Sequence, residues 1–152
     1  MDNFLNISDL SSQNLRDILN IETNNSNFLK NKSIGMIFEK YSTRTRLSFN
    51  VGISQLSGNP VDIKLEDLNI SREESFEDTF RAMSCYLDGL VYRTSDHNKL
   101  IKASKYFNKP IINALSDISH PCQALSDIYT LKETFNSLDV SVLWMGDMNN
   151  VC

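Results

Sequence analysis

The sequence predicts an α/β fold in which a parallel sheet carries helices on both faces, giving three layers. Two observations predict it. Short apolar runs of strand length alternate with segments whose apolar residues recur at helical spacing, and polar turns separate them. Strands that alternate with single helices pair in parallel through right-handed crossovers. In such sheets ligands bind beyond the carboxyl ends of the strands, so the polar residues after each strand are candidates for a binding site.

The apolar runs have the length expected of buried strands. In chain order they span residues 33–38, 60–65, 88–92, 110–115 and 140–145. The first four belong to one domain, expected at residues 1–138. The fifth, within residues 139–152, is expected to be the first strand of a second domain.

Helices are expected before and between these strands, because apolar residues fall on one helical face in each intervening segment. The opening helix, near residues 10–21, can be capped by Ser11 or Ser12, a later one by Asp96, and the last has Pro121 in its first turn. The apolar positions, helix by helix, are Leu15, Ile18 and Leu19; Phe49, Ile53 and Leu56; Phe76, Phe80, Met83 and Leu87; Leu100, Ala103 and Phe107; Ala124, Ile128, Leu131 and Phe135.

Composition limits the classes of function. A chain of 152 residues that is 41% hydrophobic can bury a core. A net charge of −4 and a pI near 5.1 offer no general attraction to nucleic acid or an acidic membrane. No apolar run is long enough to cross a membrane, and no signal-like start is present, so a cytoplasmic protein is expected. Cys85, Cys122 and Cys152 lack the spacing of a zinc site or a disulfide framework.

A phosphate site is one interpretation of the polar cluster after the first strand. Ser42, Thr43 and Thr45 supply hydroxyl groups at an expected helix N-terminus, where unpaired backbone N–H groups favour an anion. Arg44 can add a two-pronged hydrogen bond, and Arg93, after the third strand, a second positive charge. The simpler alternative is that Ser42 only caps the helix while the arginines lie in solvent, and the spacing leaves both open.

The cluster after the fourth strand can bind a carbonyl group. His120 stands at the start of a helix, where the helix dipole favours a neutral imidazole that donates a hydrogen bond. Gln123, one turn later, can hold an amide-like group. A structural histidine is the alternative for His120, and His97 is expected in an exposed first turn. Cys122 is expected to be a packed, non-catalytic thiol because no second histidine lies nearby in sequence as its base.

Several motifs together resemble a known family. They are Phe38-Glu39-Lys40, Ser42-Thr43-Arg44-Thr45-Arg46, Glu74-Ser75 with Asp78-Thr79, Arg93, and His120-Pro121-Cys122-Gln123. Their order and approximate spacing resemble the aspartate and ornithine carbamoyltransferases from about Leu10 onward. The Phe-Glu-Lys and His-Pro-Cys-Gln forms, together with residues 144–151, resemble the ornithine branch.

The resemblance implies roles for individual residues. Carbamoyl phosphate would be bound by Ser42, Thr43, Arg44, Thr45, Arg93, His120 and Gln123. Of these, Arg44, Arg93 and His120 would be catalytic. Arg46 would have a supporting role, and Asn150 would contact L-ornithine. The resemblance further implies a carbamoyl-phosphate-binding domain at residues 1–138, citrulline and phosphate as products in arginine metabolism, a homotrimer, and neither metal nor organic cofactor.

Two substitutions and one absence depart from the family pattern. Asn69 stands where many relatives place a residue that reaches a neighbouring subunit, and Phe80 replaces a small alanine, which we attribute to local packing. The family's Asp-x-x-x-Ser-Met-Gly and His-Cys-Leu-Pro motifs do not occur, so this chain alone is expected to make no citrulline. A non-catalytic anion-binding or assembly domain, and a carbamoyltransferase for another amine, are the alternatives.

Overall fold

The computed structural model describes residues 3–21, 27–68, 74–147 and 149–150. The strands are β1 (Ser33–Phe38), β2 (Asn59–Ile63), β3 (Gly89–Arg93) and β4 (Ile111–Leu115). The α-helices are α1 (Ser12–Leu19), α2 (Arg44–Gln55), α3 (Phe76–Tyr86), α4 (His97–Tyr106) and α5 (Pro121–Phe135). Short 3₁₀ turns, η1 (Ile7–Asp9) and η2 (Leu65–Asp67), precede α1 and follow β2.

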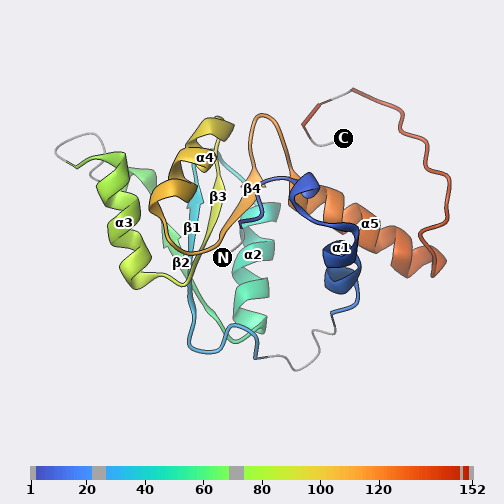
Figure 1. Cartoon of the computed structure of the whole chain (residues 1–152), viewed down its shortest axis with the longest axis horizontal. Coiled ribbons are helices and arrows are strands. Elements are labelled where there is room, and N and C mark those ends of the chain that lie inside the picture. Colours follow the sequence, from blue (N-terminus) through green and yellow to red (C-terminus); the bar gives the residue numbers. More distant parts are fainter. Residues whose placement is uncertain (1–2, 22–26, 69–73, 148, 151–152) are drawn as a thin grey trace.

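The strands form one parallel sheet in the order β2-β1-β3-β4, which confirms the predicted fold class. Figure 1 shows α3 and α4 on one side of this sheet and α2 and α5 toward the other. The register pairs Phe38 of β1 with Arg93 of β3, so these two strands end side by side. The loops that leave them therefore begin at the same edge.

Each sheet face buries its own apolar core. On the α3 and α4 side, Phe80, Leu100 and Phe107 pack against strand residues that include Tyr92. On the α2 side, Ile53 packs with residues of β1, β3 and β4. Successive strand residues point to opposite faces, so a sheet covered on both sides needs runs that are apolar throughout. Phe80 stacks on Phe76 and is 1% exposed, which confirms its expected role in packing.

Helix starts follow the expected caps. Ser11 accepts a hydrogen bond from the backbone N–H of Asn14 at 3.1 Å, and Asp96 accepts one from Asn98 at 2.9 Å. Pro121 occupies the first turn of α5. In the part of the chain that the structure describes, no helix has the length and apolar character of a membrane span.

The fifth strand, predicted at residues 140–145, is wrong. These residues form no strand, and Val142, Leu143, Trp144 and Met145 have exposed fractions of 56–82%. The predicted strand is the first of a second domain, so its partner strands would lie outside the sheet β2-β1-β3-β4. A strand needs a hydrogen-bonding neighbour, and the described residues supply none for this segment.

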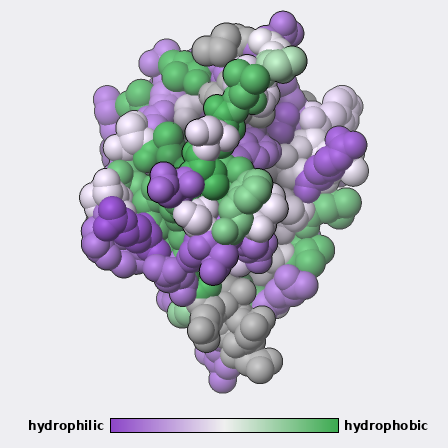
Figure 2. Space-filling model, turned by 90° about the vertical axis from the view of Figure 1, so that its right-hand side faces the viewer, coloured by the Kyte–Doolittle hydropathy of each residue, from purple (hydrophilic) through white to green (hydrophobic). Residues whose placement is uncertain are grey.

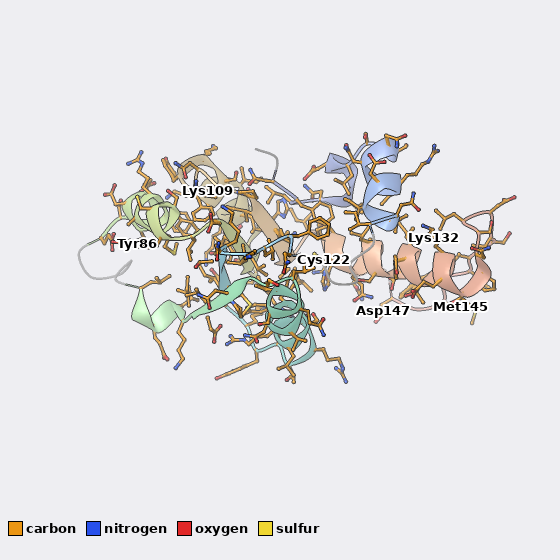
Figure 3. All side chains as sticks on the ribbon, turned by 90° about the horizontal axis from the view of Figure 1, so that it is seen from below. Tyr86, Lys109, Cys122, Lys132, Met145 and Asp147 are labelled. Carbon is orange, nitrogen blue, oxygen red and sulfur yellow. The ribbon has the colours of Figure 1, made fainter. Side chains whose placement is uncertain are left out.

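The segment after α5 runs back above that helix in Figure 1. Figure 2 views the molecule from this side and shows hydrophobic patches among hydrophilic surface. In Figure 3, Met145 and Asp147 lie along the α5 side of the molecule.

Candidate functional site

The predicted site residues lie where β1, β3 and β4 end at the carboxyl edge of the sheet. One loop joins β1 to α2 and contains Ser42 and Thr43, and another joins β4 to α5 and contains His120. Arg93 ends β3 between them. Parallel topology therefore brings together residues that lie far apart in the sequence.

Arg93 contacts the segment that leads from β1 into α2. Its Nη1 donates to the hydroxyl of Ser42 at 3.2 Å and lies 3.5 Å from the hydroxyl of Thr45. Its Nε is buried and, among the described residues, has no hydrogen-bond partner. Burial lowers the pKa of Arg93, yet a guanidinium stays protonated at neutral pH. A buried cation with an unused donor is suited to an anionic ligand.

The α2 N-terminus adds backbone donors to this cation. Thr43 is the N-cap residue, but no side chain within the described residues caps the helix. The hydroxyl of Ser42, which the simpler interpretation assigned to capping, accepts from Arg93 instead. The first N–H groups of α2 therefore keep their capacity to bind an anion.

An open pocket of about 430 Å³ joins the α2 N-terminus to the start of α5. Arg44 and Thr45 line it from α2, and His120 and Gln123 line it from the other side. Arg44 is exposed, so its charge is available to a ligand. This pocket brings Arg44 and Thr45, predicted to bind the phosphate, together with His120 and Gln123, predicted to bind the carbamoyl group.

Ser42 and Thr43 line a second hollow, of about 600 Å³. Arg46 also borders it, but its guanidinium is held by Asp62 at 2.7 Å and lies over the Phe38 ring at 5.1 Å. These contacts give Arg46 a structural role in fixing α2 against β1 and β2.

His120 is half-buried, and its environment favours the neutral imidazole. Burial lowers its pKa most, the positive charge of Arg93 lowers it further, and Asp127 acts in the opposite direction. Its Nδ1 is buried and has no hydrogen-bond partner among the described residues. A neutral imidazole with an unused ring nitrogen can donate to a ligand oxygen.

Gln123 and Cys122 both line this pocket, but their side chains have different partners. Gln123 donates to Asp127 at 2.8 Å, which orients its amide on α5. Cys122 lies where α5 meets the sheet in Figure 3, and its thiol donates to the carbonyl of Asn113 at 3.4 Å. Burial raises the pKa of Cys122 to about 11. The thiol is therefore packed, as predicted, and is not an activated nucleophile.

The predicted exposure of His97 is wrong. His97 is 5% exposed, and its Nδ1 shares a hydrogen bond with the hydroxyl of Ser116 at 2.8 Å, because α4 packs its first turn against the loop after β4. Asn150 donates to the backbone carbonyl of Ser116. Asn69 lies outside the described residues.

Sequence reasoning gave no role to a buried carboxylate next to the site. Glu39 accepts hydrogen bonds from Tyr92 at 2.7 Å, Thr94 at 2.8 Å and Lys99 at 3.1 Å. The available signal was a charged residue directly after a buried apolar strand, where a carboxylate needs partners. Across the described residues, no cluster of His, Cys, Asp or Glu has a geometry that could hold a metal ion.

Comparisons with known proteins agree with this geometry. Residues 2–133 match the family model described as aspartate/ornithine carbamoyltransferase, carbamoyl-P binding domain. An ornithine carbamoyltransferase from Methanocorpusculum labreanum is 43% identical over 98% of this chain and 52% of its own length. The chain spans about half the length of the curated relatives it matches.

The chain also has the fold of solved ornithine carbamoyltransferases. Ornithine carbamoyltransferase from Thermus thermophilus matches with a TM-score of 0.88 and 31% identity, over 98% of this chain and 54% of that one. The anabolic ornithine carbamoyltransferase from Campylobacter jejuni matches with a TM-score of 0.81 and 35% identity, over 89% and 46%. The family match over residues 2–133 and the shared fold show that the chain belongs to the aspartate/ornithine carbamoyltransferase family.

Proposed function

We propose that this chain is the carbamoyl-phosphate-binding part of an ornithine carbamoyltransferase. One observation carries the proposal: Arg93 contacts Ser42 and Thr45, and Thr45 lines a pocket together with Arg44 and His120. Two arginines and several hydroxyl groups therefore lie near the N-terminus of α2. These are the groups that bind a phosphate dianion.

In this proposal the two parts of the ligand meet different loops. The phosphate lies at the α2 N-terminus with Ser42, Thr43, Arg44, Thr45 and Arg93. The carbamoyl group lies toward α5, where neutral His120 donates to its carbonyl oxygen and Gln123 holds its amide. The lowered pKa of His120 supports this assignment because an uncharged imidazole does not oppose the cations beside it.

The reaction requires a second substrate. The δ-amine of ornithine attacks the carbamoyl carbon, the bond from that carbon to the phosphate oxygen breaks, and the amine loses a proton, giving citrulline and phosphate. Arg44, Arg93 and His120 would stabilise the developing charge on the leaving phosphate and the carbonyl oxygen. We assign residues 1–138 to carbamoyl phosphate binding, and Asn150 to contact with ornithine when the ornithine-binding half is present.

The homotrimer and the cytoplasmic location stay predictions from the resemblance. Light scattering tests the first. A trimer that binds phosphate but gains no activity when mixed with an ornithine-binding half would favour the assembly-domain alternative. Citrulline formation from that mixture with ornithine, and no carbamoylated product from other amines, would favour the ornithine transferase.

Isothermal titration of the chain with carbamoyl phosphate tests binding. We expect Arg44→Ala to weaken binding by about 1.5–3 kcal/mol, the contribution of one hydrogen bond to a charged group. Arg81→Ala is the matched control, because Arg81 lies on α3 and pairs with Asp78 away from the pocket. No binding by the unaltered chain, or equal binding by Arg44→Ala, would overturn the proposal.

A further inference from the structure

We propose that Glu39 is a positioning residue that holds Arg93 where its guanidinium contacts Ser42 and Thr45. The inference rests on the proposed function, because it concerns how the same site is held ready for its anion. Within the described residues the Glu39 carboxylate makes no hydrogen bond to Ser42, and Glu39 does not line the pocket that His120 lines. Its carboxylate acts through the strand that carries Arg93.

The Glu39 carboxylate is buried and well supplied with donors. Its side chain is 8% exposed. Oε1 accepts from the Tyr92 hydroxyl at 2.7 Å, Oε2 accepts from the Thr94 hydroxyl at 2.8 Å, and Lys99 donates to both oxygens at 3.1 Å. Because Lys99 offsets its charge, Glu39 adds little net field at the anion, and its effect there is geometric.

Tyr92 and Thr94 stand on either side of Arg93 in the sequence. They are 2% and 1% exposed, and the Tyr92 ring packs in the core that α3 and α4 cover. The Arg93 guanidinium instead reaches Ser42 and Thr45 at the start of α2. Alternate residues of a strand point to opposite faces. The hydrogen bonds from Tyr92 and Thr94 to Glu39 on one face therefore fix the position of the Arg93 side chain on the other face.

Backbone hydrogen bonds also hold the end of β3 in place. The N–H of Glu39 donates to the carbonyl of Arg93 at 3.0 Å, and the N–H of Thr94 donates to the carbonyl of Leu115 at 3.0 Å. The strand register is irregular between Tyr92 and Arg93, so regular pairing alone does not hold this point. Glu39 also begins the loop that leads to Ser42. Its side chain therefore links this loop to the end of β3, which carries Arg93.

A double-mutant cycle tests the inference, with dissociation constants for carbamoyl phosphate taken from titrations followed by amide chemical shifts. We expect Glu39→Gln to weaken binding by about tenfold in the unaltered chain. In an Arg93→Ala background the same change should have an effect below about twofold, because the group that Glu39 positions is gone. Glu77→Gln is the control, since it removes a carboxylate that pairs with Lys102 at 2.9 Å between α3 and α4.

Unchanged binding by Glu39→Gln, or an equal loss with and without Arg93, would overturn the inference while leaving the proposed function intact. A chain that does not bind carbamoyl phosphate at all, or that binds it equally after Arg93→Ala, would overturn both. Circular dichroism checks that each variant folds. If Glu39→Gln does not fold, Tyr92→Phe, which removes one donor and keeps the ring in the core, takes its place in the cycle with the same expected loss of coupling.

Discussion

The guanidinium of Arg93 lies 3.2 Å from the hydroxyl of Ser42, although the two residues are 51 positions apart in the sequence. Parallel pairing of β1 with β3 creates this contact, because Phe38 and Arg93 lie opposite each other at the ends of their strands. The proposed anion site therefore depends on sheet topology. Changes at Arg93 should affect the ligand far more than the fold.

Arg93→Lys should weaken carbamoyl phosphate binding by about tenfold, even though it keeps the positive charge. Arginine offers several N–H donors in a fixed plane, and the one that meets Ser42 also approaches Thr45. A lysine ammonium carries the charge without that planar fork. Isothermal titration measures the change. Equal affinity for the two chains would show that charge alone is sufficient there.

His120 should make folding sensitive to pH near neutrality. Its pKa in the folded chain lies below the ordinary value of 6.5, chiefly through burial. The unfolded chain then holds the proton more readily, so the free energy of unfolding should decrease as pH falls from about 6.5 toward the lower folded pKa. Above about pH 7.5 the imidazole is neutral in both states and contributes no pH dependence.

Urea denaturation at about pH 7.5 and about pH 5.5 checks this linkage. His120→Gln should lose less stability between the two pH values than the unaltered chain, because it has no imidazole to protonate. The remaining pH dependence of this variant serves as the baseline for all other groups. Identical losses would mean that His120 titrates alike in the folded and unfolded states.

The sequence was sufficient for much of the fold and for the assembly of the site. The first four strands, the helix faces and the gathering of Arg44, Thr45, His120 and Gln123 around one pocket follow from periodicity and parallel topology. Such features depend on local patterns and one general rule about strand ends.

Other features depend on distant partners and were missed. The burial of His97 requires the loop after β4, and the role of Glu39 requires Tyr92 and Thr94. The segment at residues 140–145 is apolar enough for a strand, but the predicted strand belongs to a second domain, and none of the described residues pairs with it. A strand forms only beside a partner, and a local pattern does not show whether one is present, so this prediction failed.

Cys122 should react slowly with thiol reagents. Burial raises its pKa to about 11, so at pH 8 almost none of it is the reactive thiolate. Cys85 is exposed and provides the comparison within the same chain. Timed alkylation with peptide mapping should find Cys85 modified well before Cys122, and Cys122→Ser should bind carbamoyl phosphate normally. Faster labelling of Cys122 would refute the packed-thiol assignment.

Lys132 should stabilise the contact between α1 and α5. Its ammonium donates to the carbonyl of Leu19 at 2.8 Å and to the side chain of Asn20 at 2.6 Å, closing the C-terminal end of α1. Figure 3 shows Lys132 on α5 toward α1. Lys132→Met should lower the free energy of unfolding by about 0.5–1.5 kcal/mol. Thermal unfolding measures this, with the exposed Lys105→Met as a control expected to change stability little.

A chain shortened to residues 1–138 should keep its affinity for carbamoyl phosphate and become more soluble. The removed part includes Val142, Leu143, Trp144 and Met145, all exposed apolar side chains. Exposed apolar surface favours self-association. Sedimentation at increasing concentration compares the two chains, and titration compares their affinities. Loss of binding on shortening would contradict the assignment of the whole anion site to residues 1–138.

A crystal structure of the chain soaked with carbamoyl phosphate tests the central claim most directly. We expect phosphate oxygens within about 3 Å of Arg44 and Arg93 at the α2 N-terminus, with the carbamoyl oxygen facing His120. Density for the ligand elsewhere, without contact to these three side chains, would contradict the proposed site.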